Sequence, residues 1–306
     1  MYKFNNILVC LDLTEMDESL IGYANFLVDT FKPSSLTFIH VMDTYEIPEE
    51  IMSEADESEE KPLKDILHEE IKEKVDEYYK CEEQLRPNVV MEEGHTVERI
   101  VKYAQKSKTD LALMGKKVGY VGEGGVVKKI IGLIPASVLL ISETSHYKYT
   151  KIMVRTNFAN PSVVAYKMAK YIQNITDATI EFHNVYKLPY NYFPEQSSAA
   201  ATKIKNRLKP YMEKKYEKFI KKYALPSDVS FDYSVDVKGD EAQSLYNYAV
   251  RNQVDLVVSG TKLKSQLANI IMDSTSEKLA GVEKNIPILI VKDIKEFVGF
   301  FKALFE

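Results

Sequence analysis

The sequence contains only two cysteines, Cys10 and Cys81, among 306 residues, and it contains no tryptophan. Two cysteines cannot form a disulfide framework, and they favour a reducing compartment. No apolar run approaches the roughly 18 uncharged residues that a membrane-spanning helix needs, and residues 1–6 show no signal peptide. We therefore expect a cytoplasmic protein that makes no membrane contact.

Catalytic and metal-binding motifs are also missing. No Cys-x-x-Cys, His-Glu-x-x-His or Gly-x-Ser-x-Gly pattern occurs, and the five histidines form no close pair of ligands. These absences argue against zinc sites and acyl-transfer hydrolases, so we predict no metal site and no catalytic residue. The formal net charge of −5 and the pI near 5.7 argue against general nucleic-acid binding.

The chain does contain a long internal repeat. Residues 6–12 recur as 151–157, and residues 94–115 recur as 239–260, both with an offset of 145. A repeat of this length indicates a duplicated domain and not a solenoid. We expect domain 1 at residues 1–146, domain 2 at 147–293 and a C-terminal helical extension at 294–306.

Within each half, short apolar segments alternate with longer amphipathic ones. In residues 62–85 the apolar side chains return every three or four positions, which predicts one apolar helix face. Such alternation predicts an α/β fold with helices on both faces of a parallel sheet and ligands at the carboxyl ends of the strands. The expected strands of the first half are Ile7–Leu11, Leu36–Val41, Val89–Glu92, Leu111–Gly115 and Val138–Ile141. The expected helices are Met16–Phe31, Pro62–Leu85, Val97–Ser107 and Val126–Leu133.

Several of these features resemble the universal stress protein family. They are a first strand Ile-Leu-Val-x-x-Asp, a glycine-led helix leading to Asp-Leu-x-x-Met-Gly, and a glycine-rich loop closed by an apolar strand. The resemblance covers nearly the whole chain as two tandem domains. It implies a stress-response function and two doubly wound domains of the adenine-nucleotide α-hydrolase type, each with a five-stranded parallel sheet. Some members of this family bind ATP, and others bind no nucleotide.

The resemblance implies a candidate nucleotide site in domain 1. Asp12 matches the acid that contacts the nucleotide at a strand end, where a carboxylate can accept hydrogen bonds from ribose hydroxyls. Val41 matches a backbone contact with adenine, and Gly115 matches the first glycine of the phosphate motif. The pattern then breaks, because Val118 and Lys128 occupy the positions of the next two glycines and the loop is shorter than in the motif.

That loop is still suited to phosphate, because its glycines allow positive φ and close backbone approach, its lysines add charge, and the next helix offers N–H groups. The alternative interpretation is a surface turn whose glycines serve only for bending. We expect at most weak binding of ATP or AMP, in domain 1 only, and weak ATP hydrolysis stays open. The candidate binding residues are Leu11, Asp12, Val41, Met114, Gly115, Lys116, Gly124, Gly125 and Val126.

Domain 2 is a poorer candidate for nucleotide binding. Asn157 replaces the carboxylate of Asp12, while Leu263 and Asp273 occupy the positions of two motif glycines. A carboxylate beside a triphosphate is repelled by it. We therefore expect a degenerate site in domain 2.

Other functional classes compete with this interpretation. A nucleotide-free scaffold would use the duplicated fold for docking, whereas an adenylate-forming enzyme would need a catalytic constellation that the sequence does not show. We expect the two domains to pair about a pseudo-two-fold axis inside one chain. We expect two separate sheets, so that a single continuous sheet would contradict this architecture. A homodimer or another protein partner stays open.

Charge is divided unevenly between the halves. Residues 1–147 hold 16 basic and 28 acidic residues, whereas residues 148–306 hold 24 and 17. Many of the acidic residues lie in Glu46–Glu60 and many of the basic residues lie in Lys203–Lys222, at equivalent places of the repeat. Two solvated segments, or electrostatic complementarity between halves or between chains, are the alternatives. Nucleic-acid binding by the basic segment is disfavoured, because the acidic half repels the same polymer.

Three further features remain open at this stage. His40 and His183 lie near the ends of equivalent strands, one residue out of step, and either line a site or pack at the strand end. Cys10, inside an apolar strand, is most simply a small core residue. The phenylalanine-rich extension after residue 293 docks either on domain 2 or on a partner.

Overall fold

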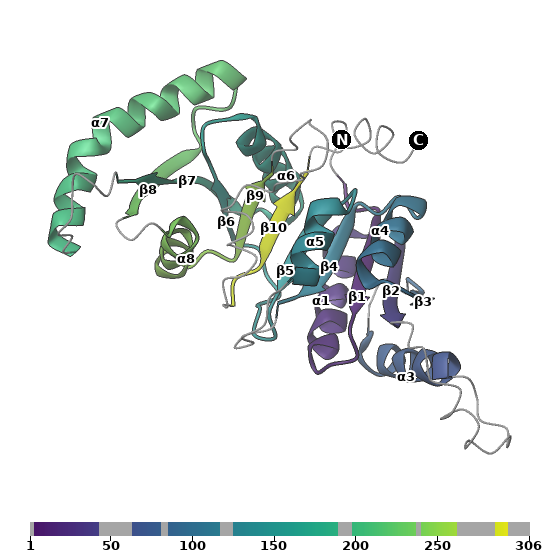
Figure 1. Cartoon of the computed structure of the whole chain (residues 1–306). Coiled ribbons are helices and arrows are strands. Elements are labelled where there is room, and N and C mark those ends of the chain that lie inside the picture. The colour runs from purple at the N-terminus through teal and green to yellow at the C-terminus, as the bar shows by residue number, and fades with distance from the viewer. Residues whose placement is uncertain are drawn as a thin grey trace, which may run out of the picture.

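The computed structural model describes residues 3–42, 63–80, 85–116, 125–188, 198–236, 240–261 and 285–292. In these ranges the chain forms one twisted sheet with helices on both faces (Figure 1). The strands are β1 Asn6–Leu11, β2 Ser35–Met42, β3 Asn88–Glu93, β4 Leu111–Gly115, β5 Ser137–Ile141, β6 Lys151–Arg155, β7 Thr179–Lys187, β8 Ser230–Asp236, β9 Leu256–Gly260 and β10 Ile288–Val291. The helices are α1 Met16–Phe31, α3 Leu63–Tyr78, α4 Thr96–Lys106, α5 Gly125–Leu133, α6 Asn160–Thr176, α7 Ser198–Tyr223 and α8 Glu241–Arg251.

Each half is a five-stranded parallel unit. The strand order is β3-β2-β1-β4-β5 in the first half and β10-β9-β6-β7-β8 in the second. α1, α3, α6 and α7 contribute to one apolar core and α4, α5 and α8 to the other, on the two faces of the sheet. The doubly wound α/β fold predicted from the sequence is confirmed, with the strands of the first half placed within one residue of their expected ends.

The two halves join edge to edge. β5 and β10 are fully buried apolar strands, and they pair antiparallel, with Leu139 opposite Leu289. Val138 faces Ile290, and Leu140 faces Ile288, so the register is that of two equivalent strands related by a two-fold axis. The expectation of two separate sheets is wrong: each edge strand covers the unpaired backbone of the other, which produces one continuous ten-stranded sheet.

Side chains from both halves also meet beside this seam. The hydroxyls of Tyr23 and Tyr149 are hydrogen-bonded at 3.0 Å inside an aromatic cluster on the α1 and α6 face. Lys292 follows β10 directly, and its buried Nζ donates to the carbonyl of Ile134 in the first half at 2.6 Å, just after the carboxyl end of α5. Burial lowers the pKa of Lys292 to about 7. The seam is therefore a packed interior and not a hinge between loosely tethered domains.

α3 is shorter than the predicted Pro62–Leu85. It ends at Tyr78 because the Asn25 side chain takes over the next backbone groups, donating to the Tyr78 carbonyl at 3.0 Å and accepting from the Lys80 N–H at 3.0 Å. The segment Glu46–Glu60, Cys81 and the C-terminal extension lie outside the described residues. Within the described part, no helix has the length and apolar character to cross a membrane.

Candidate functional site

The centre of each half contains a topological switch point. β1 leads outward to β2, whereas its other neighbour, β4, leads toward β5. The loops that leave the carboxyl ends of two such strands diverge and leave a crevice for a ligand. The equivalent place in the second half lies between β6 and β9.

The structure brings most of the predicted site residues to this edge. Leu11 ends β1 and Met114 lies one residue before the end of the adjacent β4, both as buried side chains. Val41 lies near the end of β2, and Gly115 ends β4. Asp12 follows β1 directly and is exposed. An exposed carboxylate thus lies beside the buried apolar ends of β1 and β4.

A buried carboxylate, which sequence analysis missed, shapes the turn that carries Asp12. Asp17, fully buried in the first turn of α1, accepts hydrogen bonds from the backbone N–H groups of Asp12 at 3.0 Å and Leu13 at 2.9 Å. Leu13 has a left-handed φ of 60°. Lys74 of α3 lies 3.8 Å from the same carboxylate. Burial raises the pKa of Asp17 although these N–H groups and Lys74 act against it.

Charge at the start of α1 is unfavourable for phosphate. Asp17 and Glu18 lie in its first turn, beside Glu15 and the exposed Asp12. A helix amino end attracts anions through its N–H groups, but carboxylates at the same end already supply negative charge. A phosphate in this crevice is therefore better placed toward α5, whose first turn contains no acidic residue.

The second loop of the crevice is described only at its two ends. The backbone N–H of Lys116 donates to Ile141 at 2.7 Å and extends the β4–β5 pairing, and the Lys116 side chain is buried with its Nζ. Gly125 opens α5 without a left-handed φ and with open space where a Cβ would lie, and Val126 is half exposed. Gly125 therefore does not use the positive φ that glycine allows. Gly124 lies outside the described residues.

Gly115 has a packing role that needs no ligand. A Cβ there would lie 2.5 Å from Met16 Cγ, because the start of α1 packs directly on the end of β4. The equivalent Gly260 is still more constrained, since a Cβ would lie 2.0 Å from the backbone oxygen of Pro161. Both halves thus have little room for a side chain where the strand meets the helix, and the second half has the least.

The equivalent turn of the second half is neutral. Ser162 replaces Asp17 and accepts from the Asn157 N–H at 3.0 Å, while its hydroxyl donates to Asn157 Oδ1 at 3.0 Å. The same Oδ1 accepts from the Ala159 N–H at 3.2 Å. The Asn157 side chain is therefore engaged within its own turn.

The register also settles the relation between the two histidines. His40 Nδ1 lies 3.0 Å from the Leu11 carbonyl, and its structural equivalent is Asn184, whose side chain donates to the Thr156 carbonyl at 2.7 Å. His183 instead aligns with Ile39, because Arg155 pairs with His183 as Cys10 pairs with Ile39. His40 and His183 therefore occupy opposite faces of their strands.

A polar cluster around His183, also missed from the sequence, fills the face under α8. His183 is fully buried and stacks on Tyr248 with ring centroids 3.6 Å apart, and its Nε2 lies 2.9 Å from Ser234 Oγ. Burial lowers the pKa of His183 to about 3, so the ring is neutral, and its Nδ1 has no hydrogen-bond partner. His183 is buried whereas Ser234 and Tyr248 are partly exposed, and we assign no nucleophile to this serine–histidine pair. The equivalent face of the first half is apolar, with Ile39 and Cys10 in its core.

A salt bridge occupies the carboxyl edge of this face. Arg155 replaces Cys10 and contacts Glu241 Oε1 through Nε at 3.0 Å and Nη2 at 2.8 Å, while Lys187 lies 3.1 Å from Glu241 Oε2. Cys10 itself is buried, and burial raises its pKa to about 12, in agreement with a core role. Among the described residues, no group of three or more His, Cys, Asp or Glu side chains is arranged to hold a metal ion.

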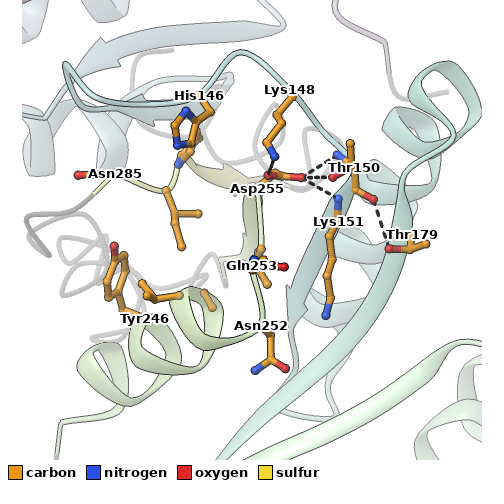
Figure 2. Close-up of a pocket in the computed structure, with 15 residues that line it drawn as sticks. His146, Lys148, Thr150, Lys151, Thr179, Tyr246, Asn252, Gln253, Asp255 and Asn285 are labelled. Carbon is orange, nitrogen blue, oxygen red and sulfur yellow. Dashed lines mark hydrogen bonds and ion pairs between the residues drawn. The ribbon is translucent and has the colours of Figure 1, made fainter.

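Figure 2 shows a cavity of about 730 Å³ at the opposite, amino-end edge of the second half. Its central carboxylate, Asp255, accepts from the N–H groups of Thr150 at 2.9 Å and Lys151 at 3.1 Å, and pairs with Lys148 at 3.3 Å (Figure 2). The equivalent Asp110 holds the start of β1 in the same manner. The polar groups of this cavity thus serve strand entry, and we assign no ligand to it.

Comparison with known proteins gives a family match for the first half. Residues 3–142 match the model of the Universal stress protein family. A curated relative, the stress response protein NhaX of Bacillus subtilis (strain 168), is 39% identical over 62 residues, which is 20% of this chain and 37% of that protein. The chain thus spans well under half of that relative.

Two solved structures cover nearly the whole chain. A protein of Pseudomonas aeruginosa UCBPP-PA14 assigned to the universal stress proteins matches 99% of this chain and 98% of its own, with a TM-score of 0.64 and 12% identity. A universal stress protein of Archaeoglobus fulgidus DSM 4304 matches 95% of this chain and 99% of its own, with a TM-score of 0.60 and 13% identity. At such identities these likenesses establish the α/β fold alone.

Proposed function

We propose that the whole chain is a tandem universal stress protein, a stress-response module whose first half provides a weak adenine-nucleotide site and whose second half carries a degenerate one. The domains would span residues 1–146 and 147–293, followed by the extension 294–306. The family match over the first half and the repeated fold of the second support this proposal. A cytoplasmic location stays a prediction.

One observation carries the nucleotide site: the exposed Asp12 carboxylate at the switch point between β1 and β4. Its position allows it to accept hydrogen bonds from ribose hydroxyls, with the apolar ends of β1, β2 and β4 beside it. In the second half the same position holds Asn157, an uncharged amide whose Oδ1 accepts from Ala159 and Ser162. Asp12 Oδ1 likewise accepts from Thr14 Oγ1 at 2.5 Å, so the two positions differ in the charge of the side chain. A nucleotide therefore favours the first half.

The same geometry supports weak binding. The acids at the start of α1 repel phosphate, and the Lys116 ammonium lies in the interior, not at the surface of the crevice. Binding of ATP or AMP would depend on the base, the ribose and the amino end of α5. Hydrolysis is not part of the proposal.

A nucleotide-free scaffold is the second candidate, and the packing of Gly115 favours it. Because Met16 would collide with any Cβ at this position, the glycine is explained without phosphate. Under this alternative the crevice binds no nucleotide, and the duplicated sheet only presents surfaces to partners.

Calorimetric titration of the full chain with ATP and AMP separates the two candidates. The matched variants are Asp12→Ala and Asn157→Ala. We expect Asp12→Ala to weaken binding about tenfold, the loss that one hydrogen bond to a charged group represents, and Asn157→Ala to leave it unchanged. Equal losses would contradict the asymmetric assignment. No heat of binding for the unaltered chain would favour the scaffold, and nucleotide retained one-to-one through purification would contradict weak binding.

A further inference from the structure

Two equivalent helices of the repeat, α3 and α7, have outer faces of opposite charge. Each follows the second strand of its half and precedes the third, and each packs on the α1 and α6 face of the sheet. The sequence of α3 contains six acidic and three basic residues, whereas that of α7 contains nine basic and two acidic residues. The structure shows where these charges lie.

α7 directs its apolar residues inward and its basic residues outward. Met212, Phe219 and Ile220 are buried against the sheet. On the opposite side, basic residues follow one another at steps of four, seven, four and three, which keeps them on one helix face. This basic face consists of the exposed residues Lys203, Arg207, Lys214, Lys218 and Lys221.

α3 has the reverse arrangement. Ile71 and Val75 are buried, and Lys74 turns inward to the buried Asp17. The inward turn of this lysine removes a positive charge from the outer side of the helix. The acidic face that remains consists of the exposed residues Glu69, Glu70, Glu73, Asp76 and Glu77.

The two faces cannot meet within one molecule. α3 packs beside β3 and α7 beside β8, which are the two end strands of the ten-stranded sheet (Figure 1). Nine inter-strand steps separate these strands, which is about 43 Å at about 4.8 Å per step. Complementarity between the halves of one chain, one alternative from the sequence, is therefore excluded for these helices.

We infer that the basic face of α7 docks on the acidic face of α3 of a second copy of this chain. The contact is heterologous, since it joins two different surfaces, and its repetition builds a row of molecules unless it closes into a ring. A second copy fits better than nucleic acid or an anionic membrane, because each copy carries the complementary acidic face and the chain has a formal net charge of −5. Beside the basic face, Tyr211 is the one large apolar residue exposed on the described part of α7, which is too few for a helix that enters lipid.

Charge exchange between copies tests this contact. The first variant carries Lys214→Glu, Lys218→Glu and Lys221→Glu, and the second carries Glu73→Lys, Asp76→Lys and Glu77→Lys. Each variant alone opposes like charges at the contact. A mixture restores attraction, because the acidic α7 of the first variant meets the basic α3 of the second.

A control variant makes the same net charge change as the first variant, but on the other side of the sheet. Lys102→Glu, Lys106→Glu and Arg251→Glu alter exposed positions of α4 and α8. Circular dichroism of every variant shows whether it remains folded. If net charge alone, and not its position, controlled self-association, the control would also associate more weakly than the unaltered chain.

The readout is sedimentation velocity at about 0.01 M and about 1 M salt, where the Debye length falls from about 30 Å to about 3 Å. At low salt we expect the unaltered chain and the control to exceed the 35.0 kDa of one chain with rising concentration. We expect a rise in dissociation constant of at least about tenfold at high salt or in either variant alone, and recovery in the mixture. The inference would be overturned if the unaltered chain stayed monomeric at low salt or if the mixture of variants stayed monomeric. It would also be overturned if the unaltered chain bound DNA or anionic vesicles without self-associating and the first variant lost that binding.

Discussion

The two halves share a backbone but place ionisable side chains on opposite faces of the sheet. In the first half, the buried carboxylate of Asp17 lies under the α1 turn, and the α4 face is apolar around Ile39. In the second half, the neutral Ser162 replaces that acid, and the buried His183 replaces the isoleucine. The two halves therefore share their turns and strand register, while each has a polar interior of its own.

Substitution of the two strand-end glycines gives the largest expected difference between the halves. Gly260→Ala places a Cβ 2.0 Å from the backbone oxygen of Pro161, so the start of α6 must move. Gly115→Ala instead meets the side chain of Met16, which can change rotamer. We expect Gly260→Ala to cost about 3 kcal/mol of unfolding free energy or more and Gly115→Ala about 1 kcal/mol.

Urea unfolding followed by circular dichroism measures this pair. Gly125→Ala is the matched control, because open space surrounds its added Cβ at the start of α5. We expect this variant to be neutral or slightly stabilising, as alanine is the better helix former. A loss at Gly115 equal to that at Gly260 would show that Met16 is held as rigidly as a backbone.

His183 gives the second half a sensitivity to acid that the first half lacks. Its folded pKa of about 3 lies below the ordinary 6.5, so the unfolded chain binds the proton first as the pH falls. The contribution of His183 to the unfolding free energy is fully present above about pH 6.5 and is lost as the pH falls toward 3. Between pH 7.5 and pH 5 we expect the loss to reach about 2 kcal/mol.

The comparison with His183→Ile, which installs the residue of the first half, isolates this effect. Asp232 and Lys205, the charged groups that act on the His183 ring, are present in both proteins. The difference in pH dependence between the two proteins therefore comes from His183 and its interactions with these groups. The unfolding free energy of the unaltered chain should fall by about 2 kcal/mol relative to that of His183→Ile as the pH falls from 7.5 to 5. Parallel curves would mean that the ring is protonated in the folded chain.

The sequence predicted the helices and strands better than the candidate site. The spacing of apolar residues reports which side chains are buried, and burial determines the helices and strands more directly than it determines a site. The apolar runs of β1 and β4 are strands in the structure, and Met16–Phe31 is a helix with those ends. Asp17 gave no signal, since an acid in a first helical turn is ordinary for a surface position. Its burial depends on Lys74 of α3, which is distant in sequence. The continuous sheet was also missed, because strand pairing between β5 and β10 leaves no trace in the alternation of elements.

The smallest expected effect concerns Asp17 itself, and only its sign is predicted. Burial raises the folded pKa above the ordinary 3.8, so the folded chain holds this proton at a pH where the unfolded chain has lost it. The stability of the unaltered chain should therefore fall, relative to Asp17→Ser, as the pH rises from 3.8 through the folded pKa. That variant copies the second half, where Ser162 supports the same turn without charge.

Lys74→Met should deepen the fall, because the ammonium at 3.8 Å favours the ionised carboxylate. The measurement is urea unfolding of the three proteins across this pH range. A relative gain in stability with rising pH would instead mean that the two N–H groups and Lys74 outweigh the cost of burial, and that the first half holds Asp17 as a stabilising anion.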